Sequence, residues 1–348
     1  MTVLVTGANG LLGNNLIRAL CAKKIPVRGM VRQSSDLRSL QGLPVELAYG
    51  DVRDADALKA AATGCDLLFH TAAVFSYWGY SREEMIQTAE EGARNTVNAA
   101  QAAGIKRIIL TASSSVLGPN WSRTPLTEED GSDLEGTLDY FYTKGLQEKL
   151  TLECGREAGI EVISVCPAVF IGPYDFRPSA SLPTLTDYLF DPFKLTYPGG
   201  VNLVHVQDVV EAHLLLADKG IPFERYLVGG ENLTWRNLHE LIAETGGVSK
   251  PRLCMGRKAA YMGAAMMELG AKITGKPPMG TRATARMVGS YFWYDDAKIR
   301  ALGFKSRSAQ NTLADTLAWL LTSPHLSEKQ RGALTPSEEV RGLLGQYS

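Results

Sequence analysis

Residues 3–13 read Val-Leu-Val-Thr-Gly-Ala-Asn-Gly-Leu-Leu-Gly, and this stretch decides the fold expected of the chain. An apolar strand leads directly into three glycines, and an apolar helical pattern follows. Glycines spaced in this way allow a sharp turn, let the backbone approach a pyrophosphate, and let the helix pack closely on the strand. The first N–H groups of the helix would then face the phosphates. The stretch predicts a dinucleotide-binding turn, with purely steric glycines as the alternative; its residues are Gly7, Asn9, Gly10, Leu11, Leu12 and Gly13.

Beyond this turn, short apolar strands alternate with helical patterns. Alternation of this kind predicts a parallel sheet covered by helices on both faces, that is, an α/β Rossmann fold with a doubly wound sheet. The expected strands are Val3–Thr6, Val27–Val31, Val45–Ala48, Leu67–His70, Arg107–Leu110 and Val162–Cys166, and the expected helices are Leu11–Ala22, Ala55–Ala62, Arg82–Ala103 and Tyr140–Glu157.

The alternation stops after Pro167, where several prolines interrupt the pattern and helices later dominate. We therefore expect a smaller, mainly helical substrate lobe behind the dinucleotide domain. The dinucleotide domain is expected at residues 1–166, with residues 202–218 returning to its sheet as a strand and a helix. The lobe is expected at residues 167–201 and 219–322. The polar C-terminal tail, residues 323–348, is expected to pack loosely.

The composition is that of a globular protein, with 45% hydrophobic and 21% charged residues. A formal charge of -1 gives no electrostatic reason to expect a nucleic-acid partner. The five cysteines form no C-x-x-C pair, which favours free thiols over a disulfide framework or a metal site. We find no secretory leader and no apolar run of roughly 20 residues, so a cytoplasmic protein without a membrane span is expected.

The residue after the second predicted strand bears on the type of dinucleotide. An NAD site usually has an acidic residue there, which binds the ribose hydroxyl. This chain has Arg32, and an arginine suits the 2′-phosphate of NADP. We therefore expect NADP(H) to be favoured over NAD(H). A solvated surface arginine is the alternative, and Asp36 is a competing partner for the ribose.

Tyr140 and Lys144 lie four residues apart in a predicted helix and therefore on one face of it, whereas Tyr142 points elsewhere. A nearby ammonium lowers the pKa of a phenol from its usual value of about 10. Such a tyrosine can donate a proton to a carbonyl oxygen as a hydride arrives, or remove the proton in the reverse reaction. An exposed amphipathic pair is the alternative. The position downstream of the glycine turn favours a proton-transfer pair.

Three serines, at positions 113, 114 and 115, follow the strand predicted at Arg107–Leu110. Ligands bind at the carboxyl ends of parallel strands, so one of these hydroxyls can hydrogen-bond a substrate oxygen and stabilise its developing charge. Serines are also common turn formers. The residues alone do not distinguish among the three.

Taken in order, these motifs resemble those of the short-chain dehydrogenase/reductase superfamily. The resemblance is to its extended branch, most of all to the dihydroflavonol-reductase and NAD-dependent epimerase/dehydratase group, and it extends to about Leu321. The motifs are Thr6-Gly7-x-x-Gly10-x-x-Gly13, Gly50-Asp51-Val52, His70-Thr71-Ala72-Ala73, the serine loop, Tyr140 with Lys144, Pro167-Ala168 before Gly172-Pro173, Val204-His205-Val206-Gln207-Asp208-Val209, Gly229-Gly230 and Ala318-Trp319.

The resemblance implies roles for particular residues. It assigns the catalytic hydroxyl to Ser113, five residues before Gly118, and it makes Lys144 a ligand of the nicotinamide ribose as well. It further implies that the cofactor is bound by Asp51 and Val52 at the adenine, by Thr71, Ala72 and Ala73 along the channel, and by Pro167 and Val169 beside the nicotinamide.

Two positions depart from the family pattern. Ala89 stands where relatives often have an asparagine, so a partner for water or proton relay is expected to be missing. Val201 stands where nucleotide-sugar epimerases commonly have an arginine that holds a diphosphate. The second departure argues against a nucleotide-sugar substrate.

The expected function is an NADPH-dependent reductase of a largely apolar ketone or aldehyde. The alternative is an epimerase or dehydratase that acts on a sugar without net redox change. A cofactor sensor without turnover is disfavoured, because it would not need the proposed catalytic set. Small-molecule carbonyl or alcohol substrates are the expected partners, and the resemblance allows a homodimer. Aromatic residues predict an apolar substrate pocket, with lobe-interface core as the alternative; they are Phe75, Tyr77, Trp78, Phe170 and Tyr174.

Overall fold

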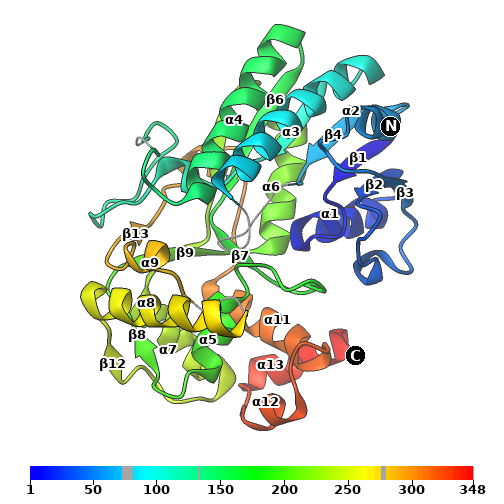
Figure 1. Cartoon of the computed structure of the whole chain (residues 1–348). Coiled ribbons are helices and arrows are strands. Elements are labelled where there is room, and N and C mark those ends of the chain that lie inside the picture. The colour runs from blue at the N-terminus through cyan, green and yellow to red at the C-terminus, as the bar shows by residue number, and fades with distance from the viewer. Residues whose placement is uncertain (73–80, 132–133, 276–279, 348) are drawn as a thin grey trace.

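A seven-stranded parallel sheet lies at the centre of the N-terminal part of the chain (Figure 1). The structure is a computed structural model that describes residues 1–72, 81–131, 134–275 and 280–347. The strand order is β10-β6-β5-β4-β1-β2-β3, so the order of the strands reverses between β4 and β1, where ligands of such sheets bind. The bounds are β1 (Val3–Thr6), β2 (Val27–Val31), β3 (Glu46–Tyr49), β4 (Leu67–His70), β5 (Arg107–Thr111), β6 (Glu161–Pro167) and β10 (Arg225–Val228).

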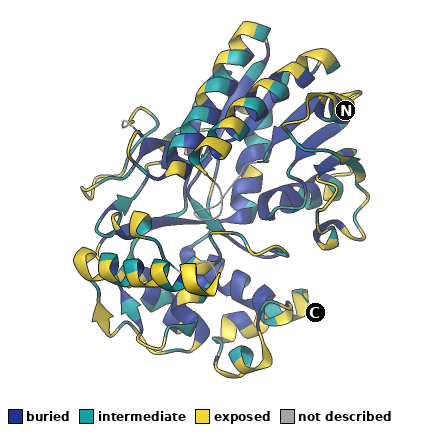
Figure 2. Cartoon of the chain, in the orientation of Figure 1, coloured by how far each residue is buried: buried dark blue, intermediate teal, exposed yellow. Residues whose placement is uncertain are grey.

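Helices cover both faces of this sheet, as the alternation of elements predicts. Helices α2, α3 and α4 lie together on one face, and α1 packs against α6 on the other (Figure 1). The central strands between them are buried (Figure 2), and Val3, Leu68, Ile109 and Val162 are each 0% exposed. The predicted Rossmann fold is therefore confirmed. The helix bounds are α1 (Leu11–Ala22), α2 (Ala55–Ala62), α3 (Arg82–Ala103), α4 (Asp139–Ala158) and α6 (Val206–Lys219).

The structure contains a second, four-stranded sheet that the sequence analysis does not predict. Strand β9 pairs with β7, β11 and β13 in this small sheet, not with the large one. The prediction that residues 202–218 return to the large sheet is therefore correct for helix α6 and wrong for the strand before it. Strand β10, which was expected in the lobe, pairs with β6 instead. Both strands are short and mostly buried, and such short segments do not reveal their partners. The bounds are β7 (Val169–Ile171), β9 (Gly200–His205), β11 (Glu231–Thr234) and β13 (Tyr291–Phe292).

The C-terminal lobe has its own apolar core. Helices α5, α7 and α11 contribute fully buried side chains to it, among them Leu185, Leu238 and Leu313. The small sheet separates this core from the large sheet. The remaining bounds are α5 (Pro183–Phe190), β8 (Leu195–Thr196), α7 (Trp235–Gly246), β12 (Leu253–Cys254), α9 (Arg282–Ala285), α10 (Ala297–Arg300) and α11 (Ala309–Thr322).

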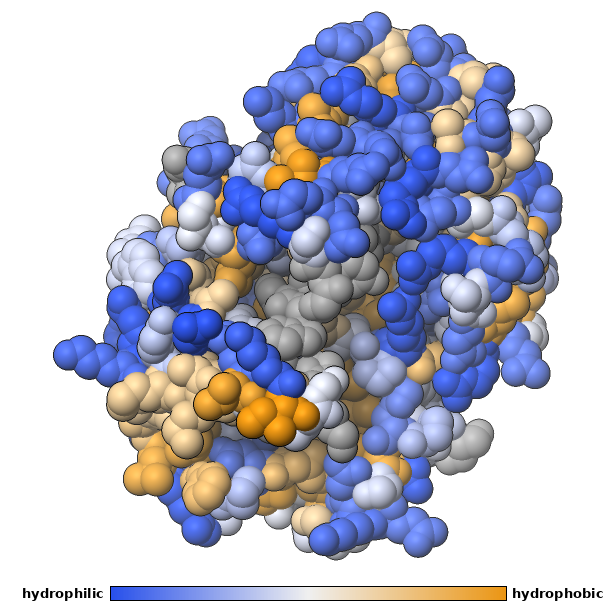
Figure 3. Space-filling model, viewed as in Figure 1, coloured by the Kyte–Doolittle hydropathy of each residue, from blue (hydrophilic) through white to orange (hydrophobic). Residues whose placement is uncertain are grey.

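Helix α8 (Arg257–Thr274) exposes large apolar side chains at the surface of this lobe. Met266 is 76% exposed and Ile273 is 81% exposed, whereas Ala264 on another face is 2% exposed. Figure 3 shows the resulting hydrophobic cluster over α8. Within the described residues, no helix combines the length and the apolar character that crossing a membrane requires.

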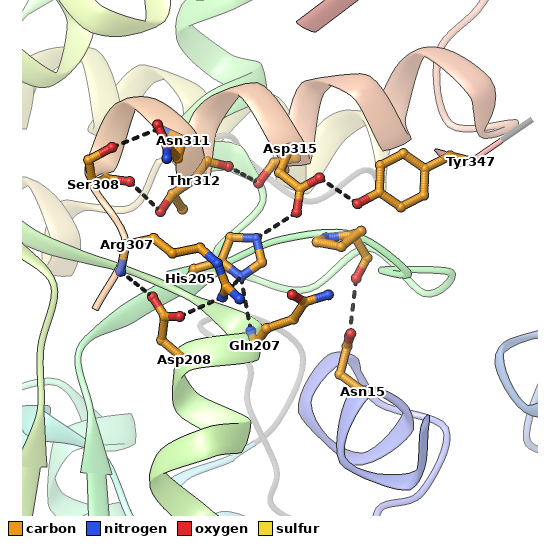
Figure 4. A network of polar contacts seen from close by, with 12 residues as sticks. Asn15, His205, Gln207, Asp208, Arg307, Ser308, Asn311, Thr312, Asp315 and Tyr347 are labelled. Carbon is orange, nitrogen blue, oxygen red and sulfur yellow. Dashed lines mark hydrogen bonds and ion pairs between the residues drawn. The ribbon is translucent and has the colours of Figure 1, made fainter. Parts of the chain in front are cut away.

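The C-terminal tail packs against the lobe, so the prediction of loose packing is wrong. Helices α12 (Glu328–Gly332) and α13 (Glu338–Leu343) follow α11, and Val340 is fully buried in the lobe core. The tail is polar on average, but a few apolar side chains at suitable positions suffice to attach it. Figure 4 shows that the Tyr347 hydroxyl donates a hydrogen bond to Asp315, whose other oxygen lies 2.9 Å from Nε2 of His205.

Candidate active site

The glycine turn between β1 and α1 has the geometry expected of a phosphate-binding turn. Gly7 has a φ of +66°, which favours glycine. A Cβ atom at Gly13 would lie 2.3 Å from the carbonyl oxygen of Gly7, so the close approach of helix and strand requires glycine there too. Helix α1 begins at Leu11, and no side chain caps its N-terminus at Gly10. Its first N–H groups therefore remain available to an anion.

A cleft of about 670 Å³ begins at this turn and reaches α4. The cleft brings together segments that are far apart in the sequence, as expected at the carboxyl edge of a parallel sheet. The sequence-predicted residues in its lining are Gly7, Asn9, Gly10, Leu11, Leu12, Gly13, Arg32, Asp51, Val52, Thr71, Ala72, Tyr140, Lys144 and Phe170.

Four predicted residues are not in the lining of this cleft. Pro167 ends β6 and Val169 begins β7, next to Phe170, which does line the cleft. Ser113 directly follows Ala112, which also lines it, and the Ser113 hydroxyl oxygen accepts a hydrogen bond from the Ser115 hydroxyl at 2.9 Å. Tyr174 is the fourth predicted residue that is not in the lining. The predicted residues Ala73, Phe75, Tyr77 and Trp78 lie outside the described residues.

Tyr174 contributes to the contact between the lobes, and its place in the substrate pocket stays a prediction. The guanidinium of Arg18 lies 4.0 Å from the centre of its ring. Its ring also stacks on Phe176 and meets Tyr347 edge-on. These contacts support the alternative that Tyr174 is interface core.

Lys144 projects from α4 toward the end of β5. Its Nζ donates hydrogen bonds to the carbonyl oxygen of Thr111 at 2.8 Å and to Oε1 of Gln147 at 2.9 Å. Lys144 is only 5% exposed, and this burial lowers its pKa to about 8, against the opposing effect of Cys166 and Glu148. As far as the described residues extend, the third N–H of the ammonium remains available to a ligand in the cleft.

His70 lies at the end of β4 and contacts the same glutamine as Lys144. Its Nε2 lies 3.3 Å from Nε2 of Gln147, whose Oε1 is engaged by Lys144. The amide nitrogen of Gln147 therefore donates to His70, and the histidine proton resides on Nδ1. That atom lies 3.0 Å from the Thr6 hydroxyl and 3.3 Å from the Thr96 hydroxyl. Burial and the charge of Lys144 lower the pKa of His70 to about 3, so its ring is neutral at physiological pH.

Tyr140 and Tyr142 lie in different surroundings although they are two residues apart. Tyr140 is 8% exposed and lines the cleft, on the same face of α4 as Lys144. The ring of Tyr142 lies under the guanidinium of Arg82, which is 4.4 Å from its centre. Only Tyr140 is therefore positioned to meet a ligand beside Lys144.

The end of the cleft at β2 and β3 contains several charged residues. Arg32 and Ser35 line the cleft there. Asp36, the competing ribose partner, is not in the lining, and its carboxylate accepts a hydrogen bond from Nε of Arg38 at 2.8 Å. Asp51 lines the cleft, and its carboxylate is bound by Arg53 at 3.0 Å.

Sequence reasoning missed the loop after β7, from which Arg177–Ser181 line the cleft. The side-chain amides of Asn14 and Asn15 in α1 donate to the carbonyl oxygens of Tyr174 and Pro173, each at 3.1 Å, and so attach this loop to the glycine turn. Two buried asparagines in an apolar helix are the signal that could have revealed it. Gln147 was also missed, although it stands one turn after Lys144.

Comparisons with known proteins agree with this geometry. Residues 3–229 match the model of the NAD dependent epimerase/dehydratase family. The chain is 36% identical over 324 residues to sterol demethylase protein B from Methylococcus capsulatus, which covers 92% of this chain and 98% of the relative. It is 30% identical over 321 residues to a putative dihydroflavonol 4-reductase from Synechocystis sp., covering 90% and 93%. The crystal structure of gox2253 matches with a TM-score of 0.82 at 31% identity, covering 94% of this chain and 99% of the other.

The family model spans more than half of the chain and includes the glycine turn and the Tyr140–Lys144 pair. Several reductases are among the relatives. The chain therefore belongs to the NAD dependent epimerase/dehydratase family of extended short-chain dehydrogenases/reductases, and it is an NAD(P)-dependent oxidoreductase.

Proposed function

We propose that this chain is an NADPH-dependent reductase that converts a largely apolar ketone or aldehyde to the alcohol. The observation that carries the proposal is that Tyr140 and Lys144 line the same cleft as the glycine turn. The ammonium of Lys144 on the same helix face favours the negative charge that the phenol oxygen acquires when it gives up its proton. Tyr140 then donates its proton to the substrate oxygen as the carbonyl carbon accepts a hydride.

The residues present fit a dinucleotide, because glycines and unpaired helix N–H groups form the beginning of the cleft. The turn from Gly7 to Gly13 would hold the pyrophosphate, and Asp51 and Val52 would hold the adenine. Thr71 and Ala72 would line the channel along the cofactor. Lys144 would hold the nicotinamide ribose through its third N–H, with Pro167 and Val169 beside the ring. When bound, the cofactor supplies the hydride.

A preference for NADPH is supported by the charged groups at the ribose end of the cleft. Arg32 lines this end and can pair with a 2′-phosphate. The carboxylate that would compete for the ribose, that of Asp36, is bound by Arg38.

Among the three serines after β5, Ser113 is the best candidate for the catalytic hydroxyl. Ser114 and Ser115 are each 6% exposed, whereas Ser113 is only partly buried. Its oxygen accepts hydrogen bonds from the backbone and hydroxyl of Ser115, so its own proton is left to donate to a substrate oxygen. Such a donor stabilises charge that develops on that oxygen.

Residues of the small sheet favour an apolar substrate over a nucleotide sugar. Val201 is 2% exposed within β9, so this position provides no cation for a diphosphate. The names of the relatives point the same way, since sterol demethylase protein B and dihydroflavonol 4-reductase refer to polycyclic or aromatic compounds. Phe170 contributes an aromatic surface to the cleft.

A panel of carbonyl compounds tests this proposal. The panel should contain 3-ketosteroids, dihydroflavonols, aromatic aldehydes and small polar ketones, each assayed with NADPH and NADH at 340 nm. We expect turnover of one apolar class, faster with NADPH, and none with Tyr140→Phe. Turnover of a sugar nucleotide in place of every apolar carbonyl would instead support the epimerase or dehydratase alternative.

A further inference from the structure

Helix α8 is apolar on two opposite sides. Ala260, Ala264 and Ala271 face the lobe and are 7%, 2% and 6% exposed. Four other residues, which we call the α8 stripe, recur at helical spacing on the opposite side: Met262, Met266, Leu269 and Ile273, which are 63%, 76%, 63% and 81% exposed. At 3.6 residues per turn, the four residues of the α8 stripe lie within an arc of about 60°.

Exposure of such an apolar stripe to water is unfavourable in free energy. A surface helix of a globular protein normally directs one apolar face to the core and polar residues to the solvent. Contiguous exposed apolar residues usually mark a surface that is covered by a partner. The burial of the alanines already explains how α8 packs on the lobe, so the α8 stripe is not needed for folding.

Charge identifies the kind of partner. Residues 248–290, which contain α8, include eight basic residues and one acidic residue, in a chain whose formal charge is only -1. Lys258 and Lys272 flank the α8 stripe near its two ends and are exposed. The single acid, Glu268, forms an ion pair with Arg282 at 2.6 Å and is largely buried. The α8 stripe is therefore framed by positive charge, which fits an anionic partner.

Side-chain type points to a fluid apolar partner. Six of the nine methionines of the chain lie within residues 248–290, two of them in the α8 stripe. Methionine is flexible and adapts to irregular apolar surroundings. Trp121 is 50% exposed near the start of α8, with the guanidinium of Arg257 4.4 Å from its ring. Tryptophan beside basic residues is typical of the interface between membrane and water.

We propose that α8 binds the surface of an anionic lipid bilayer, with the α8 stripe inserted at the level of the headgroups and Lys258 and Lys272 at the phosphates. Helices that lie in a membrane interface have this combination of apolar and basic residues. A second copy of the chain fits less well, because two faces of the same positive charge repel each other. The surface does not depend on the proposed reaction; if both hold, an apolar substrate dissolved in the bilayer lies close to the lobe.

Sedimentation with lipid vesicles tests the proposal on the full chain. Vesicles of phosphatidylcholine alone are compared with vesicles that also contain phosphatidylglycerol. We expect the wild type to sediment with the anionic vesicles and to be released by 0.5 M NaCl, roughly as screening of such contacts requires. The double variant Met266→Glu, Leu269→Glu should bind at least about tenfold less, because charged side chains do not enter the apolar layer.

Ile221→Glu is the matched control, because Ile221 is 57% exposed but follows α6 beside the large sheet. It should bind anionic vesicles as the wild type does, and both variants should unfold at the temperature of the wild type. Equal binding by the double variant and the wild type, or no binding by the wild type, would overturn the proposal. The proposal would also be overturned if light scattering showed that the wild type is a dimer and the double variant a monomer, since α8 would then join two copies of the chain. Failure of every carbonyl assay would overturn the proposed function only.

Discussion

Nζ of Lys144 donates a hydrogen bond to Oε1 of Gln147 at 2.9 Å, one helical turn further along α4. The other end of the Gln147 amide donates to His70, which is fully buried at the end of β4. The orientation of the ammonium is thereby coupled to a neutral histidine on another element. Ala89, where relatives often have an asparagine, provides no polar group, and Gln147 supplies a different partner on the cleft side of α4.

Gln147→Met should lower kcat roughly tenfold or more, since a hydrogen bond to a charged group contributes roughly 1.5–3 kcal/mol. Methionine keeps the length of the side chain and removes its hydrogen bonds to Lys144 and His70, together with the longer one to the carbonyl oxygen of Ala72. The KM for the cofactor should change less than kcat, because the glycine turn is unaltered. Gln87→Met is the matched control, because Gln87 also lines the cleft but is exposed on α3 and bonds Glu91. A loss of thermal stability with unchanged kcat would show that Gln147 acts only on folding.

The buried ammonium makes stability depend on pH in a defined direction. Burial lowers the pKa of Lys144 to about 8 in the folded state from the usual lysine value of 10.5. Between these values the unfolded chain binds more protons, so the free energy of unfolding rises with pH. Relative to Lys144→Met, the wild type should gain up to about 3 kcal/mol as the pH rises from about 8 to 10.5, and nothing below about 7. Urea unfolding of both proteins across this range measures the difference. A difference that does not change with pH would contradict the lowered pKa.

Tyr140→Phe should lower turnover by roughly 10²–10⁴-fold, as loss of a positioned general acid does. Cofactor affinity, measured by fluorescence titration, should stay within a few-fold of the wild type. Tyr142→Phe should have a mild effect, because its ring contacts Arg82 outside the cleft lining. If Tyr142→Phe were the more damaging change, the proton donor would be assigned to the wrong tyrosine.

Arg32→Ala should weaken NADPH binding and leave NADH binding nearly unchanged. A charge-assisted contact with the 2′-phosphate contributes roughly 1.5–3 kcal/mol, so the preference for NADPH should fall at least about tenfold. Isothermal titration of both cofactors against the wild type and the variant measures this preference. Equal affinities of the wild type for both cofactors would remove the basis for assigning NADP.

Features formed by residues close together in the sequence could be predicted from it. The glycine turn and the spacing of Tyr140 and Lys144 are of this kind, and the predicted bounds of α1, Leu11–Ala22, agree with the structure. Features that depend on distant residues could not. His70 and Gln147 lie 77 positions apart, and only the folded sheet brings them together.

The same reason explains the predictions that the structure corrects. Strand β9 is buried at every position and carries a central apolar pair, which indicates a strand but does not select between the two sheets. The contacts of the Tyr174 ring with Arg18 and Tyr347, from opposite ends of the chain, likewise could not be predicted from the sequence. Leu326, Leu334 and Val340 attach the tail through a few isolated apolar positions within a polar stretch.

The fate of the hydride tests the central claim most directly. A turned-over carbonyl substrate is incubated with NADPH that carries deuterium at the transferred position, and alcohol and oxidised cofactor are quantified together. The reductase account predicts one oxidised cofactor for each alcohol and one deuterium on the carbinol carbon of the product. Product that accumulates with only catalytic cofactor, without net oxidation, would contradict the account and identify a redox-neutral epimerase or dehydratase.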